Sequence, residues 1–193
     1  VFTPPLVPVL LNDYTQWWHW VVGANWQHPE GPDSSIEGMD SYPVVHIAYE
    51  DAEAYSSWSG KRLPTEAEFE YAARGGLAGK TYSWGEELNL KGKYMANYFQ
   101  GAFPINDTAE DGFKGLSPVK SFPANGYGLY DMIGNVWELC SDWYGVEVPQ
   151  NTQTLTNPKG PSTTEDPDDP FAIKHVSKGG SFICSTQYCS NYK

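Results

Sequence analysis

The sequence of 193 residues predicts a single α+β domain, residues 1–193, with two short helices, short antiparallel strands and much irregular structure. Two segments in the first half have apolar residues at helical spacing between clear start and stop signals. Beyond residue 80, short aromatic pieces alternate with Gly, Asn and Pro, and no segment sustains a helical period. A hydrophobic fraction of 40% with eight tryptophans indicates a packed core rather than disorder.

The first fifty residues are predicted to contain little regular structure. The stretch 1–20 has prolines at positions 4, 5 and 8, which favour extended or irregular backbone. The run "NWQHPEGPDSS" is typical of a loop. Behind it, "YPVVHIAY" at 42–49 predicts a short buried strand.

Two helices follow. The first is predicted over Glu50–Ser59 and ends at Gly60. The second lies in "RLPTEAEFEYAARGG", where Thr65 and Glu68 form a capping box and the glycine pair 75–76 supplies the C-terminal stop. Its predicted packing face consists of Phe69, Ala72 and Ala73.

The second half predicts short strands joined by tight turns. Asn125–Gly126 is a strong turn signal within "SFPANGYGLYDMIGNVWELCSDWYG". The polar, Pro-rich run 151–170 predicts a surface loop, and "FAIKHVSKGGSFIC" returns to a strand. No internal repeat indicates a second domain.

The net charge of −12 excludes some partners. A nucleic-acid backbone would be repelled, and no apolar run approaches the roughly 18 residues of a membrane span. We therefore expect neither a nucleic-acid nor a membrane partner. The acidic residues are compatible with a solvated surface, or with carboxylates that bind hard cations such as calcium or a basic peptide.

Common catalytic motifs are missing from the sequence. The four histidines show no H-E-x-x-H spacing, and there is no G-x-S-x-G elbow, Walker loop or dinucleotide fingerprint. Zinc hydrolase, NTPase and Rossmann functions therefore have no support in the sequence.

Two segments are rich in oxygen ligands. Asn97 and Asp111 lie in irregular backbone, and Asp131 and Glu138 flank a Gly-Asn turn. Calcium takes six to eight oxygens, which loops supply well. Neither segment matches the EF-hand spacing, and on spacing alone the capping of turns by polar side chains is the more ordinary explanation.

The three cysteines do not form a disulfide framework. Cys140 is expected to be a small buried hydrophobe. Cys184 and Cys189 follow the glycine pair 179–180, which allows close backbone approach. Two thiolates there could form a redox pair or hold Cu(I), or they could be inert thiols, and chemistry alone leaves these alternatives open.

Several motifs together resemble the formylglycine-generating enzymes, or sulfatase-modifying factors. They occur in the family's order and spacing from about Val22 to Tyr192. The motif "NGYGLYDMIGNVWE" is shared by a wide superfamily, whereas "HPEGPDS" with "GGSFICSTQYC" is specific to the catalytic branch. The other matching motifs are "GKRLPTEAEFEYAARGGL", "ANYFQGAFPINDTAEDGF", "CSDWYG" and "NPKGP".

The resemblance implies a fold related to C-type lectins. It also implies oxidation by O₂ of a cysteine in a Cys-x-Pro-x-Arg-type motif of an unfolded sulfatase, or of a peptide with that motif, to Cα-formylglycine. Cys184 and Cys189 fall on the family's pair that binds Cu(I). Ser181 and Trp137 fall on residues of the oxygen and substrate pocket, and Tyr188 falls on the wall of the substrate groove.

The resemblance further implies two calcium sites. The first would consist of Asn97, Asp111 and the carbonyls of Tyr98 and Phe113. The second would consist of Asp131, Glu138 and the carbonyls of Gly134 and Val136.

The sequence departs from the family's pattern at several positions. Ser56 and Ala73 stand where vertebrate members have disulfide cysteines, which indicates a bacterial-type member. Asn191 stands where many members have a substrate-contacting Arg. The resemblance also implies an N-terminal segment before Val1 and, beyond Lys193, a closing strand with an Asn-Leu-Gly-Phe-Arg-like run. The compartment stays open, with a bacterial cytoplasm or periplasm favoured over a eukaryotic secretory compartment.

Two alternatives have the same fold. One is a catalytically silent paralogue that only binds sulfatases or other proteins, although the retention of both cysteines argues against it. The other is a lectin-like binding module, because a fold alone does not fix a function.

Overall fold

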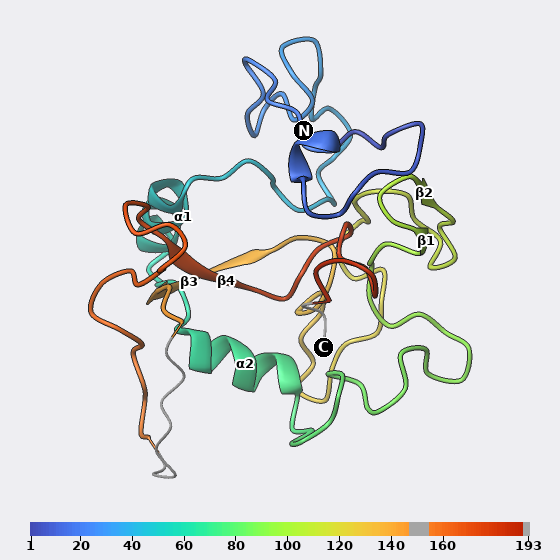
Figure 1. The fold of residues 1–193 in the computed structure, drawn as a ribbon. Coiled ribbons are helices and arrows are strands. Elements are labelled where there is room, and N and C mark those ends of the chain that lie inside the picture. Colours follow the sequence, from blue (N-terminus) through green and yellow to red (C-terminus); the bar gives the residue numbers. More distant parts are fainter. Residues whose placement is uncertain (147–154, 191–193) are drawn as a thin grey trace.

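The computed structural model describes residues 1–146 and 155–190, and it confirms a mixed fold dominated by turns and irregular backbone (Figure 1). Every helix and strand within these ranges is short. In chain order they are the 3₁₀ helix η1 (Tyr14–Gln16), α1 (Tyr49–Trp58), α2 (Glu66–Arg74), β1 (Gly101–Ala102), β2 (Asn106–Asp107), β3 (Glu138–Trp143) and β4 (His175–Lys178).

The strands β3 and β4 form an antiparallel pair, and α2 packs against it (Figure 1). Glu138 lies opposite Lys178, and the register is irregular between Leu139 and Trp143. Lys178 of β4 forms ion pairs with Glu66 and Glu70 of α2, at 3.4 and 3.2 Å. The apolar cluster between helix and strands consists of Phe69, Ala73, Cys140 and Val176.

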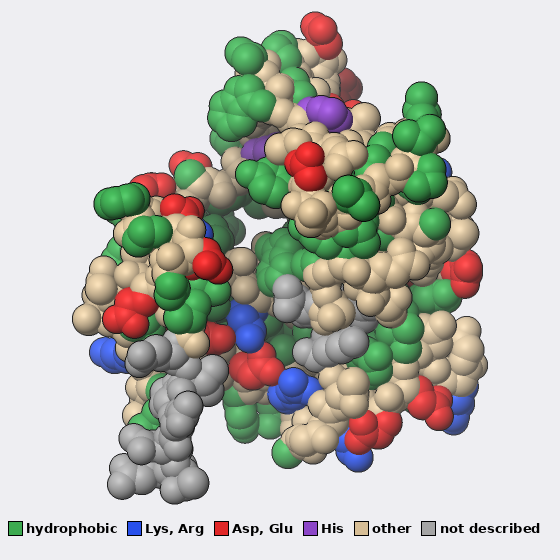
Figure 2. Space-filling view, in the orientation of Figure 1, with side chains coloured by type: hydrophobic (Ala, Val, Ile, Leu, Met, Phe, Trp, Pro, Cys, Tyr) green, Lys and Arg blue, Asp and Glu red, His purple; other side chains and the backbone are tan. Residues whose placement is uncertain are grey.

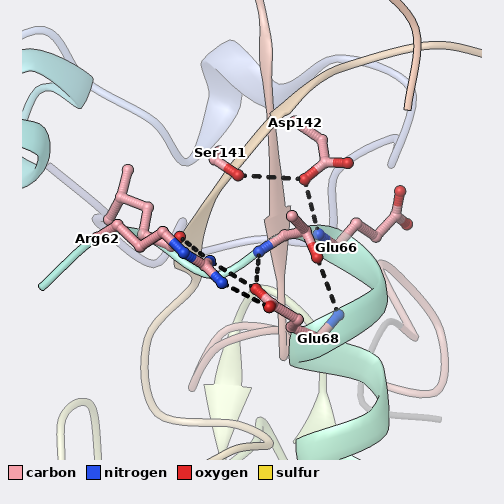
Figure 3. A network of polar contacts seen from close by, with 7 residues as sticks. Arg62, Glu66, Glu68, Ser141 and Asp142 are labelled. Carbon is pink, nitrogen blue, oxygen red and sulfur yellow. Dashed lines mark hydrogen bonds and ion pairs between the residues drawn. The ribbon is translucent and has the colours of Figure 1, made fainter. Parts of the chain in front are cut away.

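The capping box predicted for α2 is confirmed. The Glu68 main-chain N–H donates to the Thr65 hydroxyl at 3.2 Å, and the Thr65 N–H donates to the Glu68 carboxylate at 2.9 Å. Figure 3 shows two further contacts here: Arg62 pairs with Glu68, and Asp142 of β3 accepts from the Glu66 N–H at 2.8 Å. The helix ends at Gly75, whose φ of 56° is the left-handed conformation that glycine adopts without a steric penalty.

Helix α1 begins and ends one residue earlier than predicted, and it buries none of its side chains. Tyr55 and Trp58 are 68% and 81% exposed. The helix contacts the sheet through its first residue, because the Tyr49 ring stacks on His175 at 3.5 Å, and His175 stacks on Trp143 at 4.0 Å.

The prediction of a buried strand at 42–49 is wrong. This segment forms no strand in the structure, and Val44 is 57% exposed. His46 has a φ of 54°, which is incompatible with extended backbone. The alternation of apolar residues was therefore overridden by a local bend.

The N-terminal segment packs over the part of the chain that carries β1 and β2 (Figure 1). Trp17 is fully buried against Phe99 and Phe103, and Phe2 joins this cluster. Trp20 is 94% exposed. Figure 2 shows that apolar side chains reach the surface in this part, whereas acidic side chains are spread over the visible face.

Within the described ranges, no helix combines the length and the apolar character needed to cross a lipid bilayer. The loop predicted at 151–170 falls partly outside the described residues; from residue 155 onward it contains no helix or strand and is largely exposed.

Candidate active site and cation sites

Cys184 and Cys189 lie next to each other, and neither forms a disulfide. Cys184 is fully buried, whereas Cys189 is half-buried. The hydrogen bond between the two thiols, followed by burial, raises the pKa of Cys184 above its usual range. The structure therefore brings together the pair that the sequence singled out, with one sulfur protected and the other nearer to solvent.

The residues between the cysteines form a tight turn. The Ser185 N–H donates to the Tyr188 carbonyl at 2.8 Å. The hydroxyl of Ser185, which is 2% exposed, accepts from the N–H groups of Gln187 and Tyr188 at 3.2 and 3.0 Å. Cys189 itself has a φ of 58°, an uncommon conformation for a residue with a Cβ. The turn thus brings the two sulfurs together across four intervening residues.

Ser181 contacts the buried sulfur directly. Its main-chain N–H lies 3.4 Å from the Cys184 Sγ, and its hydroxyl lies 3.8 Å from the same atom. Ser181 is 5% exposed. Both contacts stabilise the thiolate form of Cys184, because a donor pointing at a sulfur favours its negative charge.

Tyr188 directly precedes Cys189 and packs against the N-terminal aromatic cluster. Its ring stacks on Phe103 at 4.9 Å and meets Trp17 edge-on at 5.4 Å. Burial, followed by the charges of the two cysteines, raises the pKa of the Tyr188 phenol. Tyr188 is therefore a rigid neighbour of the thiols.

Trp137 lines a pocket of about 560 Å³, together with Gly179 and Ser190. Gly179 is two residues before Ser181, and Ser190 directly follows Cys189. The cysteines themselves do not line this pocket, nor a larger one of about 1220 Å³ between α1 and α2. The structure thus places Trp137 in a pocket that is lined by residues flanking the cysteine segment. Asn191 lies outside the described residues.

Two of the oxygens predicted for the first calcium site converge on one donor. The side-chain amide of Gln100 donates to the Tyr98 carbonyl and, at 2.9 Å, to the Asp111 carboxylate. Burial raises the pKa of Asp111 to about 6, although the Phe113 and Tyr98 N–H groups donate to it. The buried amide of Asn97 donates through Nδ2, so its Oδ1 is the atom that could bind a cation.

The second predicted site contains two carboxylates. Burial, and then the charge of Asp131, raises the pKa of Glu138 to about 7. Asp131 accepts from the Lys120 N–H at 2.7 Å. Gly134 lies between them with a φ of 78°, and a Cβ there would come within 2.3 Å of the Asn97 carbonyl oxygen. The predicted carbonyl ligands Phe113 and Val136 lie in irregular backbone.

Residue Asn135 connects these segments, and the sequence analysis missed it. Its buried side chain accepts from Asn97 and from the Ser117 N–H, and donates to the Ser117 carbonyl. Its main-chain N–H donates to the Asn97 carbonyl, and its carbonyl accepts from Phe182. The sequence signal for this role is the Gly-Asn dipeptide, because Asn tolerates left-handed backbone, and Asn135 indeed has a φ of 63°.

The donor atoms fit the cations that the resemblance implies. The paired sulfurs suit a soft ion such as Cu(I), whereas carboxylate, amide and carbonyl oxygens suit Ca²⁺. Among residues 1–146 and 155–190, no group of three or more His, Cys, Asp and Glu side chains could hold a metal. The oxygen sites would therefore depend on amide and main-chain ligands.

Several known proteins with related sequences are named formylglycine-generating enzymes. The mouse formylglycine-generating enzyme is 51% identical over 92% of this chain and 45% of the mouse protein. The enzyme of the same name from Thermomonospora curvata is 49% identical over 92% of this chain and 56% of its own length. The one from Mycobacterium tuberculosis is 48% identical over the whole chain and 64% of its own length.

The chain thus spans roughly half to two thirds of the length of these relatives. An inactive relative also matches: the inactive Cα-formylglycine-generating enzyme 2 of Bos taurus is 52% identical over 66% of this chain and 42% of that protein. Sequence identity alone therefore does not separate active from inactive relatives.

One solved structure supports the fold, and a family description covers almost the whole sequence. PvdO from Pseudomonas aeruginosa superposes with a TM-score of 0.54 and 29% identity, over 78% of this chain and 55% of PvdO. Residues 7–193 match the family described as the sulfatase-modifying factor enzyme 1-like domain. The chain therefore belongs to the sulfatase-modifying factor family, whose members include the formylglycine-generating enzymes.

Proposed function

We propose that this protein oxidises a cysteine in a Cys-x-Pro-x-Arg-type motif of an unfolded sulfatase to Cα-formylglycine, with O₂ as oxidant and Cu(I) as cofactor. The observation that carries the proposal is the contact between the thiols of Cys184 and Cys189, one buried and one half-buried. Membership of the family makes a sulfatase the expected class of substrate.

The electron count sets a requirement for the reaction. Conversion of the substrate thiol to an aldehyde with release of sulfide removes two electrons, whereas reduction of O₂ to two water molecules takes four. The remaining two electrons must come from a reductant, such as an external thiol. Cu(I) held by Cys184 and Cys189 would supply the site at which thiolate and O₂ meet.

The neighbouring residues would hold the thiols and the substrate. Ser181 points an N–H and a hydroxyl at the Cys184 sulfur, so it favours the thiolate that a soft cation needs. Tyr188 is fixed by its stack on Phe103 and would form one wall of the substrate groove. Trp137 lines the pocket next to Ser190 and would contact the substrate there.

We also propose two structural Ca²⁺ sites. The first would use Asn97, Asp111 and the carbonyls of Tyr98 and Phe113. The convergence of Tyr98 and Asp111 oxygens on the Gln100 amide supports it. The second would use Asp131, Glu138 and the carbonyls of Gly134 and Val136, and the proximity of two partly buried carboxylates supports it. A cation at each site would offset the cost of placing these partly buried carboxylates close together or away from water.

The direct test is conversion of a peptide. The protein is incubated with Cu(I), O₂, a thiol reductant and a Cys-x-Pro-x-Arg peptide, and the aldehyde is measured by mass spectrometry. We expect a product lighter than the thiol peptide, whose aldehyde reacts with a hydrazine probe. The matched control is the peptide with Ser in place of Cys, which should not react.

The variants Cys184→Ser and Cys189→Ser test the assignment of the sulfurs. Each should lose conversion and Cu(I) binding together. Aldehyde formation by Cys184→Ser would contradict the role of that thiol. Peptide binding without any aldehyde from the copper-loaded wild type would instead indicate a silent protein, or a binding module whose fold is related to C-type lectins.

A further inference from the structure

The turn between the two cysteines is attached to the hairpin formed by β1 and β2. The side-chain Oε1 of Gln187 accepts from the main-chain N–H of Phe103 at 3.1 Å. Its Nε2 donates to the carbonyl of Gly101 at 3.4 Å. The next residue, Tyr188, stacks its ring on that of Phe103. Two adjacent turn residues thus contact the same three-residue segment of the hairpin.

The other end of the cysteine segment is attached to the same part of the chain. The main-chain N–H of Phe99 donates to the carbonyl of Cys184 at 2.9 Å. Segment 99–103 therefore holds Cys184 directly and holds the turn before Cys189 through Gln187. Because both attachments are made to one short segment, they fix the position of one sulfur relative to the other.

The backbone of segment 99–103 has little freedom to move. Gly101 has a φ of 91°, and a Cβ there would lie 2.6 Å from the Asn106 carbonyl oxygen. Phe99 and Phe103 are both at least 95% buried in the N-terminal aromatic cluster. A side chain bound to this segment is therefore bound to a well-packed part of the fold.

The turn itself needs such support. Cys189 has a left-handed φ of 58°, which is unfavourable for a residue with a Cβ. The internal hydrogen bonds of Ser185 close the turn but do not attach it to the rest of the molecule. Without the Gln187 contacts, the ring stack of Tyr188 would still hold the turn near the hairpin, but no hydrogen bond would fix its backbone to the hairpin. The turn could then relax Cys189 toward a common conformation and carry its sulfur away from Cys184.

We propose that Gln187 is a positioning residue that holds the Cys189 sulfur next to Cys184 by binding the intervening turn to the β1–β2 hairpin. This role rests on the proposed function, in which the two sulfurs share one Cu(I), but the geometry of the thiol pair can be measured without copper. Gln187 does not touch the sulfurs, so it acts through the turn.

Three variants separate this role from others. Gln187→Leu keeps the approximate size and removes both hydrogen bonds. Gln187→Glu keeps an acceptor for the Phe103 N–H and loses the donor to Gly101. The control is Thr186→Val, at the neighbouring position of the same turn, which is exposed as Gln187 is. Melting temperatures establish that each variant folds. If Gln187→Leu does not fold, the comparison of Gln187→Glu with the wild type tests the positioning role.

The first measurement is the equilibrium between the thiol pair and glutathione. Oxidised glutathione accepts two electrons and two protons from Cys184 and Cys189, which gives one intramolecular disulfide and two reduced glutathiones. The peptide that carries both cysteines is quantified by mass spectrometry. We expect Gln187→Leu to lower the equilibrium constant about tenfold, which corresponds to about 30 mV. Gln187→Glu should lie between Gln187→Leu and the wild type, and Thr186→Val should equal the wild type.

The second measurement is the affinity for Cu(I), by competition with a chromophoric chelator. Replacement of a residue that orients metal ligands typically weakens metal binding about 10–100-fold. We therefore expect Gln187→Leu to bind Cu(I) at least about tenfold more weakly than the wild type. Wild-type values for Gln187→Leu in both measurements, or a wild type that forms no disulfide, would overturn the proposal. If the wild type binds no Cu(I) but Gln187→Leu still shifts the thiol equilibrium, the copper function fails while the positioning role stands.

Discussion

The side-chain amide of Asn97 donates a hydrogen bond to the side-chain oxygen of Asn135 at 3.2 Å, and the Asn135 N–H donates back to the Asn97 carbonyl at 2.8 Å. Asn97 belongs to the first predicted calcium site, and Asn135 lies within the segment of the second. The Asn135 carbonyl also accepts from Phe182, two residues before Cys184. One buried polar network therefore joins both cation sites to the cysteine segment.

Replacing Asn135 should destabilise this network. Asn135→Ala removes one donor and one acceptor that bind Ser117 and Asn97. Because an unsatisfied buried polar group costs about 1–3 kcal/mol, we expect the free energy of unfolding to fall by about 2–4 kcal/mol in urea titrations. The exposed Asn12 provides the control, since Asn12→Ala should change stability by less than about 0.5 kcal/mol. Similar stabilities of the two variants would contradict a structural role for the network.

The contact between Gly134 and Asn97 gives a second prediction. Gly134 and Gly79 both have a positive φ, but only Gly134 would place a Cβ within 2.3 Å of a carbonyl oxygen, whereas the space at Gly79 is open. Gly79→Ala should lower the free energy of unfolding by about 1–2 kcal/mol, from backbone strain alone. Gly134→Ala should lower the free energy of unfolding by about 1–3 kcal/mol more than Gly79→Ala does, because the backbone must also shift. An equal loss of stability in the two variants would show that the segments around Gly134 and Asn97 separate easily.

Calcium binding predicts a cation-dependent melting temperature. Chelation should lower the melting temperature of the wild type, because a cation that binds only the folded state stabilises it. In Asp111→Asn the part of this dependence that comes from the first site should disappear, since the amide lacks the charge that attracts the cation, whereas the part that comes from the second site should remain. Asp40→Asn removes the same charge at an exposed position and should keep the wild-type response. If neither chelator nor added Ca²⁺ changed the melting temperature of the wild type, this result would contradict both proposed calcium sites.

The α2 capping box predicts a defined pH dependence. Arg62 and the Thr65 N–H lower the pKa of Glu68 from 4.5 to about 2. A carboxylate with a lowered pKa stabilises the folded state above its unfolded pKa, and this contribution is lost as the pH falls through the folded pKa. The stability difference between the wild type and Glu68→Gln should therefore be constant above about pH 5, shrink below pH 4.5 and vanish near pH 2. Urea titrations at several pH values would reveal a constant difference if the pKa were not lowered.

The sequence by itself determined the features that depend on neighbouring residues. The capping box of α2 could be predicted because Thr65 and Glu68 lie three residues apart. The left-handed residue that ends α2 could be predicted because this conformation favours glycine, which stands at position 75. The order of the motifs was sufficient to assign the family. The cysteine pair could also be singled out, because only four residues separate its members.

Only the tertiary structure decided the contacts between distant segments. Gln187 binds Phe103 across 84 residues, and Asn97 binds Asn135 across 38, so no local pattern indicates either pair. Tertiary structure also overrode local pattern at 42–49, where His46 bends the chain, and in α1, whose apolar spacing buries no side chain. The physical reason is the same in each case: short-range propensities fix local backbone geometry, whereas the partner that completes a buried hydrogen bond or covers an apolar side chain is supplied by the fold.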